Sequence, residues 1–146
     1  MAVPVSVRKK ELEYLKKLSS QKKITDPELL QDKIDSLIIG CKKKLIIFSS
    51  AKILCNILSK HNFEEYFPSL LRKEVIIKIR IDRVNSILVK YVNSINDTNH
   101  HNKIQLMHSI KLIEFNESMI TSDDKNLLQA KYDTNNRLTA FLTRKI

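Results

Sequence analysis

The chain has very little glycine, proline or cysteine, and it contains no tryptophan. Among its 146 residues are one glycine (Gly40), three prolines and two cysteines. Sheet-rich folds use glycine in turns that need a positive φ angle, although asparagine can replace it in some of them. The scarcity of glycine therefore favours an all-α fold over a doubly wound or an all-β one.

The chain also lacks segments that mark secreted and membrane proteins. No apolar run is long enough to cross a bilayer, and the opening MAVPVSVRKK has too short an apolar part for a secretory signal. Cys41 and Cys55 have no CxxC spacing, so we expect both to be reduced and buried. These features predict an intracellular protein, nuclear or cytoplasmic, that does not contact a membrane.

No residue pattern predicts catalysis, a cofactor or a metal. The sequence has no glycine-rich phosphate loop, no GxSxG and no nucleophile–base set at a suitable spacing. His100, His101 and His108 have no cysteine or carboxylate at ligand spacing. Glu64 and Glu65 would point different ways on a helix, which makes them a poor acid–base pair. We therefore expect a non-enzymatic protein.

Two long stretches carry apolar residues at helical spacing, within a chain that is 42% hydrophobic. In residues 69–95 the stripe runs on for about seven turns. In residues 27–60 it continues across Gly40, after a typical helix start in which Asp26 caps and Pro27 takes the first turn. We predict two long helices from these stretches.

Each stretch has an alternative interpretation as a strand. Residues 75–81 alternate β-branched apolar residues with polar ones, which is typical of a half-buried strand. Residues 45–48 followed by Ser49 and Ser50 could be a strand that enters a helix, as in an α/β unit. The first alternation stops at Asp82 and the chain has one glycine, so the helical interpretation is favoured in both.

Shorter helices are expected over residues 8–18, 103–120 and from Thr121 onward, where Thr121 to Asp124 reads as a helix cap. Residues 1–7 are expected to form a flexible arm and residues 96–102 a flexible loop. At this length the whole chain, residues 1–146, fits one domain. The sequence thus predicts a single all-α helical bundle of about five helices, two of them long.

The net charge of +10 is unevenly distributed. Residues 1–60 hold 13 basic and 6 acidic side chains, whereas residues 61–146 hold 13 and 10. A basic N-terminal half could meet a polyanion or an acidic protein. The candidate basic patch consists of Lys9, Lys10, Lys42, Lys43 and Lys44. A solvated helix face is the competing explanation for the last three.

Several isoleucines lie off the apolar stripes assigned to the core. They are Ile38, Ile39, Ile46, Ile47, Ile76 and Ile79. Long helices with apolar residues on more than one face need another surface to cover them, and exposed apolar patches usually mark interfaces. We therefore predict a protein partner, in a hetero- or homo-oligomer, that covers these residues. Coverage by shorter helices of the same chain is the alternative.

Parts of the sequence resemble the GINS subunits that carry their helical domain first. Glu11-Leu12 followed by residues 27–30 (PELL) is similar to the opening of that family, and residues 82–92 (DRVNSILVKYV) to its E-x-R-[IV]-x-x-[IL]-L-x-x-Y-L segment. Residues 109–115 lie where its L-S-x-x-E helix begins. Ser20-Gln21 replaces the Trp-Asn pair of the family. The resemblance implies a helical subunit of a DNA replication complex.

Taken together, these patterns predict a helical protein-interaction subunit of a larger assembly. The most specific version of this prediction is a GINS-like subunit that acts in DNA replication. The alternative is a basic helical protein that binds nucleic acid, such as a viral one. The salt dependence of binding distinguishes the two functions, because phosphate contacts weaken steeply with salt whereas buried apolar interfaces do not.

Overall fold

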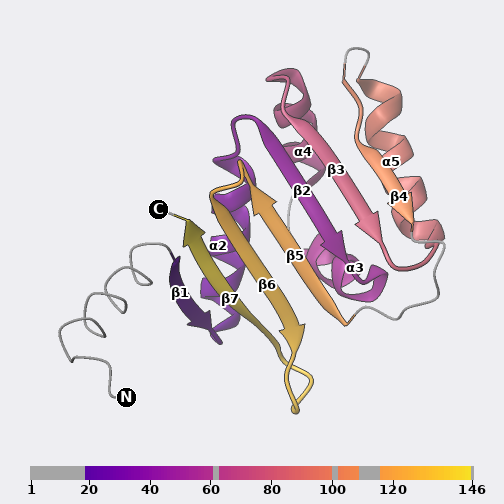
Figure 1. Cartoon of the computed structure of the whole chain (residues 1–146). Helices are drawn as coiled ribbons and strands as arrows, with labels where there is room; N and C mark the ends of the chain where they lie inside the picture. Colours follow the sequence, from indigo (N-terminus) through magenta and orange to yellow (C-terminus); the bar gives the residue numbers. More distant parts are fainter. Residues whose placement is uncertain (1–18, 61–62, 100–101, 109–115, 146) are drawn as a thin grey trace, which may run out of the picture.

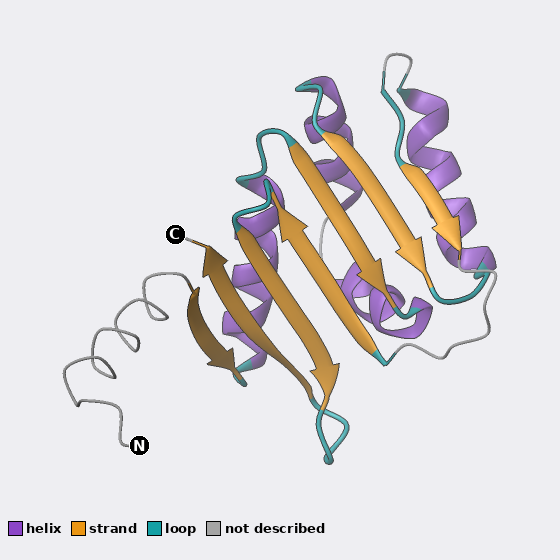
Figure 2. Ribbon diagram, viewed as in Figure 1, coloured by secondary structure: helices purple, strands orange, loops and turns teal. Residues whose placement is uncertain are grey.

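A seven-stranded sheet, covered on one face by four helices, forms the described part of the chain (Figures 1 and 2). This computed structural model describes residues 19–60, 63–99, 102–108 and 116–145. The predicted all-α helical bundle is therefore wrong. The predicted arm at residues 1–7 and helix at residues 8–18 lie outside the described residues.

The elements follow one another in the order β1 (Ser19–Ile24), α2 (Pro27–Ile39), β2 (Lys44–Ser49), α3 (Ala51–Lys60), α4 (Phe63–Arg72), β3 (Ile76–Ile81), α5 (Ser86–Thr98), β4 (Gln105–His108), β5 (Glu117–Ser122), β6 (Asn126–Tyr132) and β7 (Leu138–Lys145). Across the sheet the strand order is β1-β7-β6-β5-β2-β3-β4. Strands β2, β3 and β4 are parallel, and the other neighbouring pairs are antiparallel.

The first predicted long helix is divided by a strand. It begins as predicted, because the Asp26 carboxylate accepts a hydrogen bond of 3.1 Å from the Glu28 N–H and Pro27 opens α2. The helix ends before Gly40, and β2 follows. The Ser50 hydroxyl then accepts a bond of 3.1 Å from the Ile53 N–H at the start of α3. The alternative of a strand that enters a helix is confirmed.

The second predicted long helix is also divided by a strand. Residues 76–81 form β3, between α4 and α5, with alternate residues exposed and buried. Glu74 adopts a positive φ of 64° after α4. The Val75 N–H donates to the Leu70 carbonyl and the Glu74 N–H to that of Leu71, which is the Schellman arrangement. The alternation at residues 75–81 was therefore the correct signal.

The predicted helices after residue 102 are strands where the chain is described. Strands β4 and β5 lie within residues 103–120, and residues 109–115 between them are outside the described part. Asp123 and Asp124, predicted to cap a helix, instead turn the chain between β5 and β6 with φ angles of 55° and 57°. Helix α5 continues to Thr98, so the predicted loop at 96–102 begins inside a helix.

The reason for these errors is the way this chain makes its turns. Among the described residues, positive φ occurs at Glu74, Asp123, Asp124 and Asn136, and Gly40 has a negative φ of −79°. Aspartate and asparagine tolerate the left-handed region because their short polar side chains bond to nearby backbone. A low glycine count therefore did not exclude a sheet.

The core lies between the sheet and the helices. Strand residues that face the helices are buried, among them Leu45 and Ile47 of β2, Ile77 and Ile79 of β3, Ile120 of β5 and Leu128 of β6. Among the described residues, no helix or strand covers the opposite face of the sheet, which is turned toward the viewer in Figure 1. We call it the open face.

Candidate functional site

Side-chain alternation determines which residues form the open face. In a strand successive side chains point to opposite sides, so the partners of the buried residues face outward. Among the residues whose side chains are described, the basic ones placed there are Lys23, Lys44, Lys78, Arg80 and Lys131. The large apolar ones are Ile46, Phe48, Ile76, Met107, Met119, Leu127 and Phe141.

Seven of these outward positions are in register across the whole sheet. From β1 to β4 they are Lys23, Phe141, Gln129, Met119, Phe48, Arg80 and Met107, each paired with the next on the neighbouring strand. We call this set the cross-strand row. Each end of it places a basic residue beside a phenylalanine, with uncharged side chains in between.

The two phenylalanine rings of the row each contact a cation. The Arg80 guanidinium carbon lies 5.7 Å from the centre of the Phe48 ring. The Lys23 ammonium nitrogen lies 5.9 Å from the centre of the Phe141 ring. Both distances fall within the range of cation–π attraction. Because each pair joins residues from neighbouring strands, the sheet register itself holds the cations over the rings.

Charge is distributed very differently over the two layers. Counted over the described elements, the four helices hold five basic and six acidic residues, whereas the seven strands hold eight basic and one acidic residue. The acidic residue, Glu117, is paired in register with Lys131. Excess positive charge therefore belongs to the sheet, and a polyanion would be attracted to this layer rather than to the helices.

The predicted basic patch divides into three parts. Lys9 and Lys10 lie outside the described residues. Lys44 belongs to the open face, where its ammonium lies 3.3 Å from the Asp124 carboxylate. Lys42 and Lys43 are exposed in the turn before β2 and not on a helix.

Backbone N–H groups of the lysine turn all bind one carboxylate. Lys42, Lys43 and Lys44 donate to Asp123 at 2.8, 2.7 and 2.9 Å. Burial raises the pKa of Asp123, but the three N–H donors outweigh it and lower the pKa to about 2. The lysine run thus has a structural role through its backbone, while the side chains of Lys42 and Lys43 remain exposed.

The six isoleucines of the predicted protein interface lie in three places. Ile38, Ile47 and Ile79 are in the core, with at most 2% of their surface exposed. Ile39 is 54% exposed on α2. Ile46 and Ile76 are on the open face, where Ile76 is 45% exposed. Any interface through this set has to use the three that reach the surface.

A cleft of about 820 Å³ lies at the carboxyl ends of β2 and β3. Sites in α/β folds often occupy this position. Here the Asp82 carboxylate accepts a hydrogen bond of 2.8 Å from the Ala51 N–H, so an anion already occupies the start of α3. In the described part of the chain, no three His, Cys, Asp or Glu side chains come together as a metal site.

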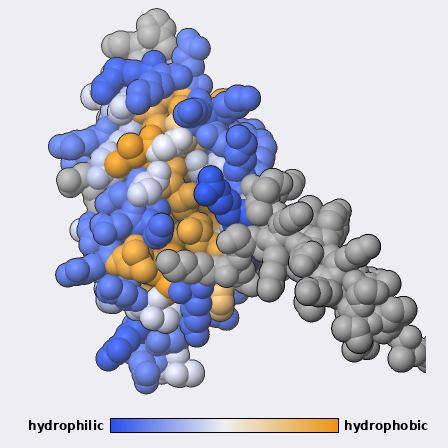
Figure 3. All heavy atoms as spheres, turned by 90° about the vertical axis from the view of Figure 1, so that its left-hand side faces the viewer, coloured by the Kyte–Doolittle hydropathy of each residue, from blue (hydrophilic) through white to orange (hydrophobic). Residues whose placement is uncertain are grey.

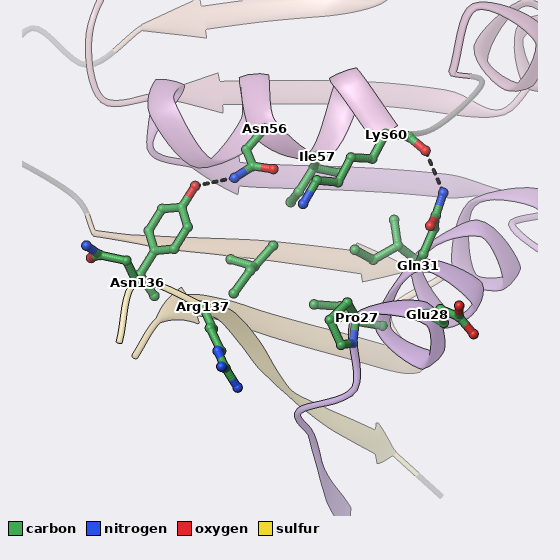
Figure 4. Close-up of a pocket in the computed structure, with 12 residues that line it drawn as sticks. Pro27, Glu28, Gln31, Asn56, Ile57, Lys60, Asn136 and Arg137 are labelled. Atoms are coloured by element: carbon green, nitrogen blue, oxygen red, sulfur yellow. Dashed lines mark hydrogen bonds between the residues drawn. The ribbon is translucent and has the colours of Figure 1, made fainter. Parts of the chain in front are cut away.

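A second pocket, of about 450 Å³, lies between α2 and α3 above β6 and β7 (Figure 4). Leu30, Ile34, Ile57 and Leu138 contribute its apolar lining. Two hydrogen bonds join its walls: Asn56 donates to the Tyr132 hydroxyl, and Gln31 donates to the Lys60 carbonyl at 2.6 Å. These bonds fix α3 against β6 and α2, so the pocket is part of the helix packing.

Apolar surface is also visible at the β1 edge of the molecule. Seen from that side, hydrophobic residues form a band between hydrophilic ones (Figure 3). No helix in the described part of the chain is long and apolar enough to cross a membrane.

The fold is shared with two solved proteins. TrmBL2, an archaeal chromatin protein, matches 97% of this chain and 55% of its own with a TM-score of 0.57 and 14% identity. Phosphatidylserine synthase from Haemophilus influenzae Rd KW20 matches 87% and 34% with a TM-score of 0.53 and 12% identity. The chain thus spans about half of the first and a third of the second.

Comparison with known sequences does not assign the chain to a family. No family model matches the chain, and no curated protein matches its sequence. At the identities found, the two structural similarities establish the fold alone. They do not concern GINS, so that resemblance stays a prediction, although the helical domain it implies differs from the α/β fold observed.

The cross-strand row was missed because β2 and β3, which carry Phe48 and Arg80, were interpreted as parts of helices. The signal was present in the alternation of residues 44–49 and 76–81, where the outward positions hold lysine, arginine and phenylalanine. Read as strands, these two segments would have placed Phe48 and Arg80 on the same face. The pairing of Lys23 with Phe141 spans more than a hundred residues, and no local pattern reports it.

Proposed function

We propose that this chain binds nucleic acid through the open face of its sheet. The observation that carries the proposal is the cross-strand row, in which Arg80 and Lys23 each lie over a phenylalanine ring. Positive charge neutralises phosphates, and aromatic rings offer surfaces on which bases can stack. The helix layer, with five basic and six acidic residues in its described helices, lacks this excess of charge.

The structural neighbours give limited support. TrmBL2 is described as a chromatin protein with a novel mode of DNA binding. Its similarity to this chain shows that the same fold occurs in a DNA-binding protein. It does not identify the residues that contact DNA here, so the proposal depends on the open face itself.

Charge reversal on the two layers tests the proposal. The open-face variant carries Lys78→Glu and Lys23→Glu. The matched control carries Lys73→Glu, exposed in the turn after α4, and Lys90→Glu, exposed on α5. Both variants change the net charge equally, so non-specific attraction falls by the same amount in each. Affinity for a labelled DNA or RNA oligonucleotide is measured by fluorescence anisotropy at several salt concentrations.

We expect the open-face variant to lose at least about tenfold in affinity, since it removes two contacts and adds two repulsions. The control should lose much less. Equal losses in the two variants would mean that binding follows net charge and not this face. Absence of salt-dependent binding by the unmodified chain would overturn the proposal.

A protein partner is the second candidate, favoured by exposed apolar residues on the same face. Ile76 is 45% and Met107 50% exposed there, and such residues are frequent at interfaces. A GINS-like replication subunit would be a specific version. Self-association is its simplest form: sedimentation should show a dimer that Ile76→Asp converts to a monomer, and a monomeric parent chain would exclude that form.

The proposed function requires no catalytic step and no cofactor. Binding to nucleic acid implies that the chain works inside the cell, in the nucleus or the cytoplasm. Both statements depend on the proposed function.

A further inference from the structure

The breadth of the open face limits how it can meet a nucleic acid. Neighbouring strands are about 4.8 Å apart, so the row from Lys23 to Met107 extends over roughly 29 Å. The major groove of B-DNA is about 12 Å wide. A face of this breadth cannot enter the groove, and a duplex laid on it would offer phosphates but no bases.

The two rings of the row are placed far enough apart to act separately. Phe48 on β2 and Phe141 on β7 are three strand spacings apart, which is about 14 Å. Between them lie Met119 and Gln129, whose side chains contact each other with 3.8 Å between the amide nitrogen and the sulfur. The part of the cross-strand row between the two rings is therefore uncharged, and its two side chains are half-buried.

Within the cross-strand row, positive charge lies beside each ring rather than between them, and Lys131, on a strand between the rings, is paired in register with Glu117. Arg80 and Lys78 are on β3 next to Phe48, and Lys23 is on β1 next to Phe141. Proteins that bind single strands combine a positive track for the backbone with aromatic side chains under the bases. In a duplex the faces of the bases are stacked on one another and are not available to a flat sheet.

We propose that the open face binds single-stranded nucleic acid in preference to duplex, with bases stacked on Phe48 and Phe141. This inference rests on the proposed function and specifies its substrate class. Both DNA and RNA single strands present the same base faces and phosphates, so the face accepts either. A base that stacks on Phe48 displaces the Arg80 guanidinium from over the ring, and the displaced guanidinium plane provides a second stacking surface beside it.

The absence of tryptophan from the chain allows a direct test. The variants Phe48→Trp and Phe141→Trp each introduce a single indole at a proposed stacking position. The control Ile87→Trp introduces one on α5, at a residue that is 69% exposed on the helix side. The tryptophan fluorescence of each variant is followed during titration with 15-nucleotide oligothymidylate, with oligouridylate and with a mixed-sequence duplex of equal length. The fluorescence anisotropy of a labelled oligonucleotide measures binding independently.

We expect both single strands to quench the indole at positions 48 and 141 and to leave the control unchanged. The duplex should bind at least about tenfold more weakly and cause no quenching. Phe48→Leu, which keeps an apolar side chain without a ring, should weaken single-strand binding roughly 5- to 150-fold and leave duplex binding within about twofold.

The outcomes separate the two proposals. Single-strand binding without quenching, or equal affinity for duplex, would overturn the inference and leave nucleic-acid binding standing. Quenching by oligothymidylate alone, or by oligouridylate alone, would contradict the statement that the face accepts both. If neither nucleic acid binds by anisotropy, the proposed function fails and the inference fails with it. Circular dichroism and thermal unfolding of each variant ensure that a loss is not due to unfolding.

Discussion

At the scale of single residues, Asp123 links two distant parts of the chain. Its carboxylate accepts hydrogen bonds from the backbone N–H groups of residues 42–44, at the start of β2, and from the Cys41 thiol at 3.4 Å. The residue itself sits in the turn between β5 and β6. One side chain thus fixes the start of a central strand against a neighbouring hairpin, which keeps β2 in register beneath the open face.

The hydrogen bonds of Asp123 should make the fold sensitive to acid. Its pKa of about 2 lies below the value of about 3.9 expected in the unfolded chain. The resulting stabilisation is complete above about pH 5 and is lost as the pH falls through about 2. We expect it to contribute about 1–2 kcal/mol, discounted for partial exposure.

Urea unfolding at pH 7, 4 and 2.5 measures this contribution. Asp123→Asn should lower the free energy of unfolding at pH 7 and flatten its decline toward pH 2.5. The control Asp124→Asn changes the next residue, whose side chain is 68% exposed and which also has a positive φ. An equally steep decline in the Asp123 variant would show that other carboxylates cause the acid sensitivity.

At the scale of elements, the sequence predicted helix starts better than it predicted element types. Asp26, Pro27 and Glu28 marked the start of α2 correctly, because capping depends only on neighbouring residues. The stripes at residues 69–95 combined two helices with a strand, since apolar residues at steps of three and four also occur by chance in β-branched strands. Helix was preferred there because the stripe continues to residue 95 while the alternation stops at Asp82, and the low glycine count supported the same choice. Both arguments were misleading.

The turn after α4 shows why the glycine count misled and offers a test. Glu74 is exposed and has a φ of 64°, at a position where glycine is usual. A non-glycine residue pays roughly 1–2 kcal/mol for this conformation. Glu74→Gly should therefore raise the free energy of unfolding by about 0.5–1 kcal/mol, measured by urea denaturation.

The neighbouring Lys73 provides the control for this prediction. It is exposed and does not have a positive φ. Lys73→Gly should destabilise by about 0.5–1 kcal/mol, because glycine there gains nothing from its freedom and loses chain entropy. Destabilisation by both substitutions would mean that the left-handed turn at Glu74 does not form.

At the scale of the whole molecule, charge follows the layers and not the halves of the chain. The sequence showed an excess of basic residues in residues 1–60, which suggested a basic N-terminal half. In the structure Lys23 and Lys44 from that half share a face with Lys78, Arg80 and Lys131 from the other. Only the pairing of strands distant in sequence brings them together, and composition cannot report such pairing.

The layered charge predicts how binding depends on salt. Each phosphate neutralised on a single strand contributes about −0.7 to the slope of log affinity against log salt. Lys44 is engaged with Asp124 at 3.3 Å and Lys131 is paired in register with Glu117, so Lys23, Lys78 and Arg80 are left as the phosphate contacts of the open face. Three contacts give a slope of about −2.1, or roughly a 20-fold loss of affinity between 50 and 200 mM salt.

Single substitutions make this slope specific to the open face. Lys78→Ala should weaken single-strand binding and reduce the magnitude of the slope by about 0.7, because one contact is lost. Lys90→Ala removes an exposed lysine from α5 on the helix side and should leave the slope unchanged. A slope near zero in the unmodified chain would contradict phosphate binding by the open face.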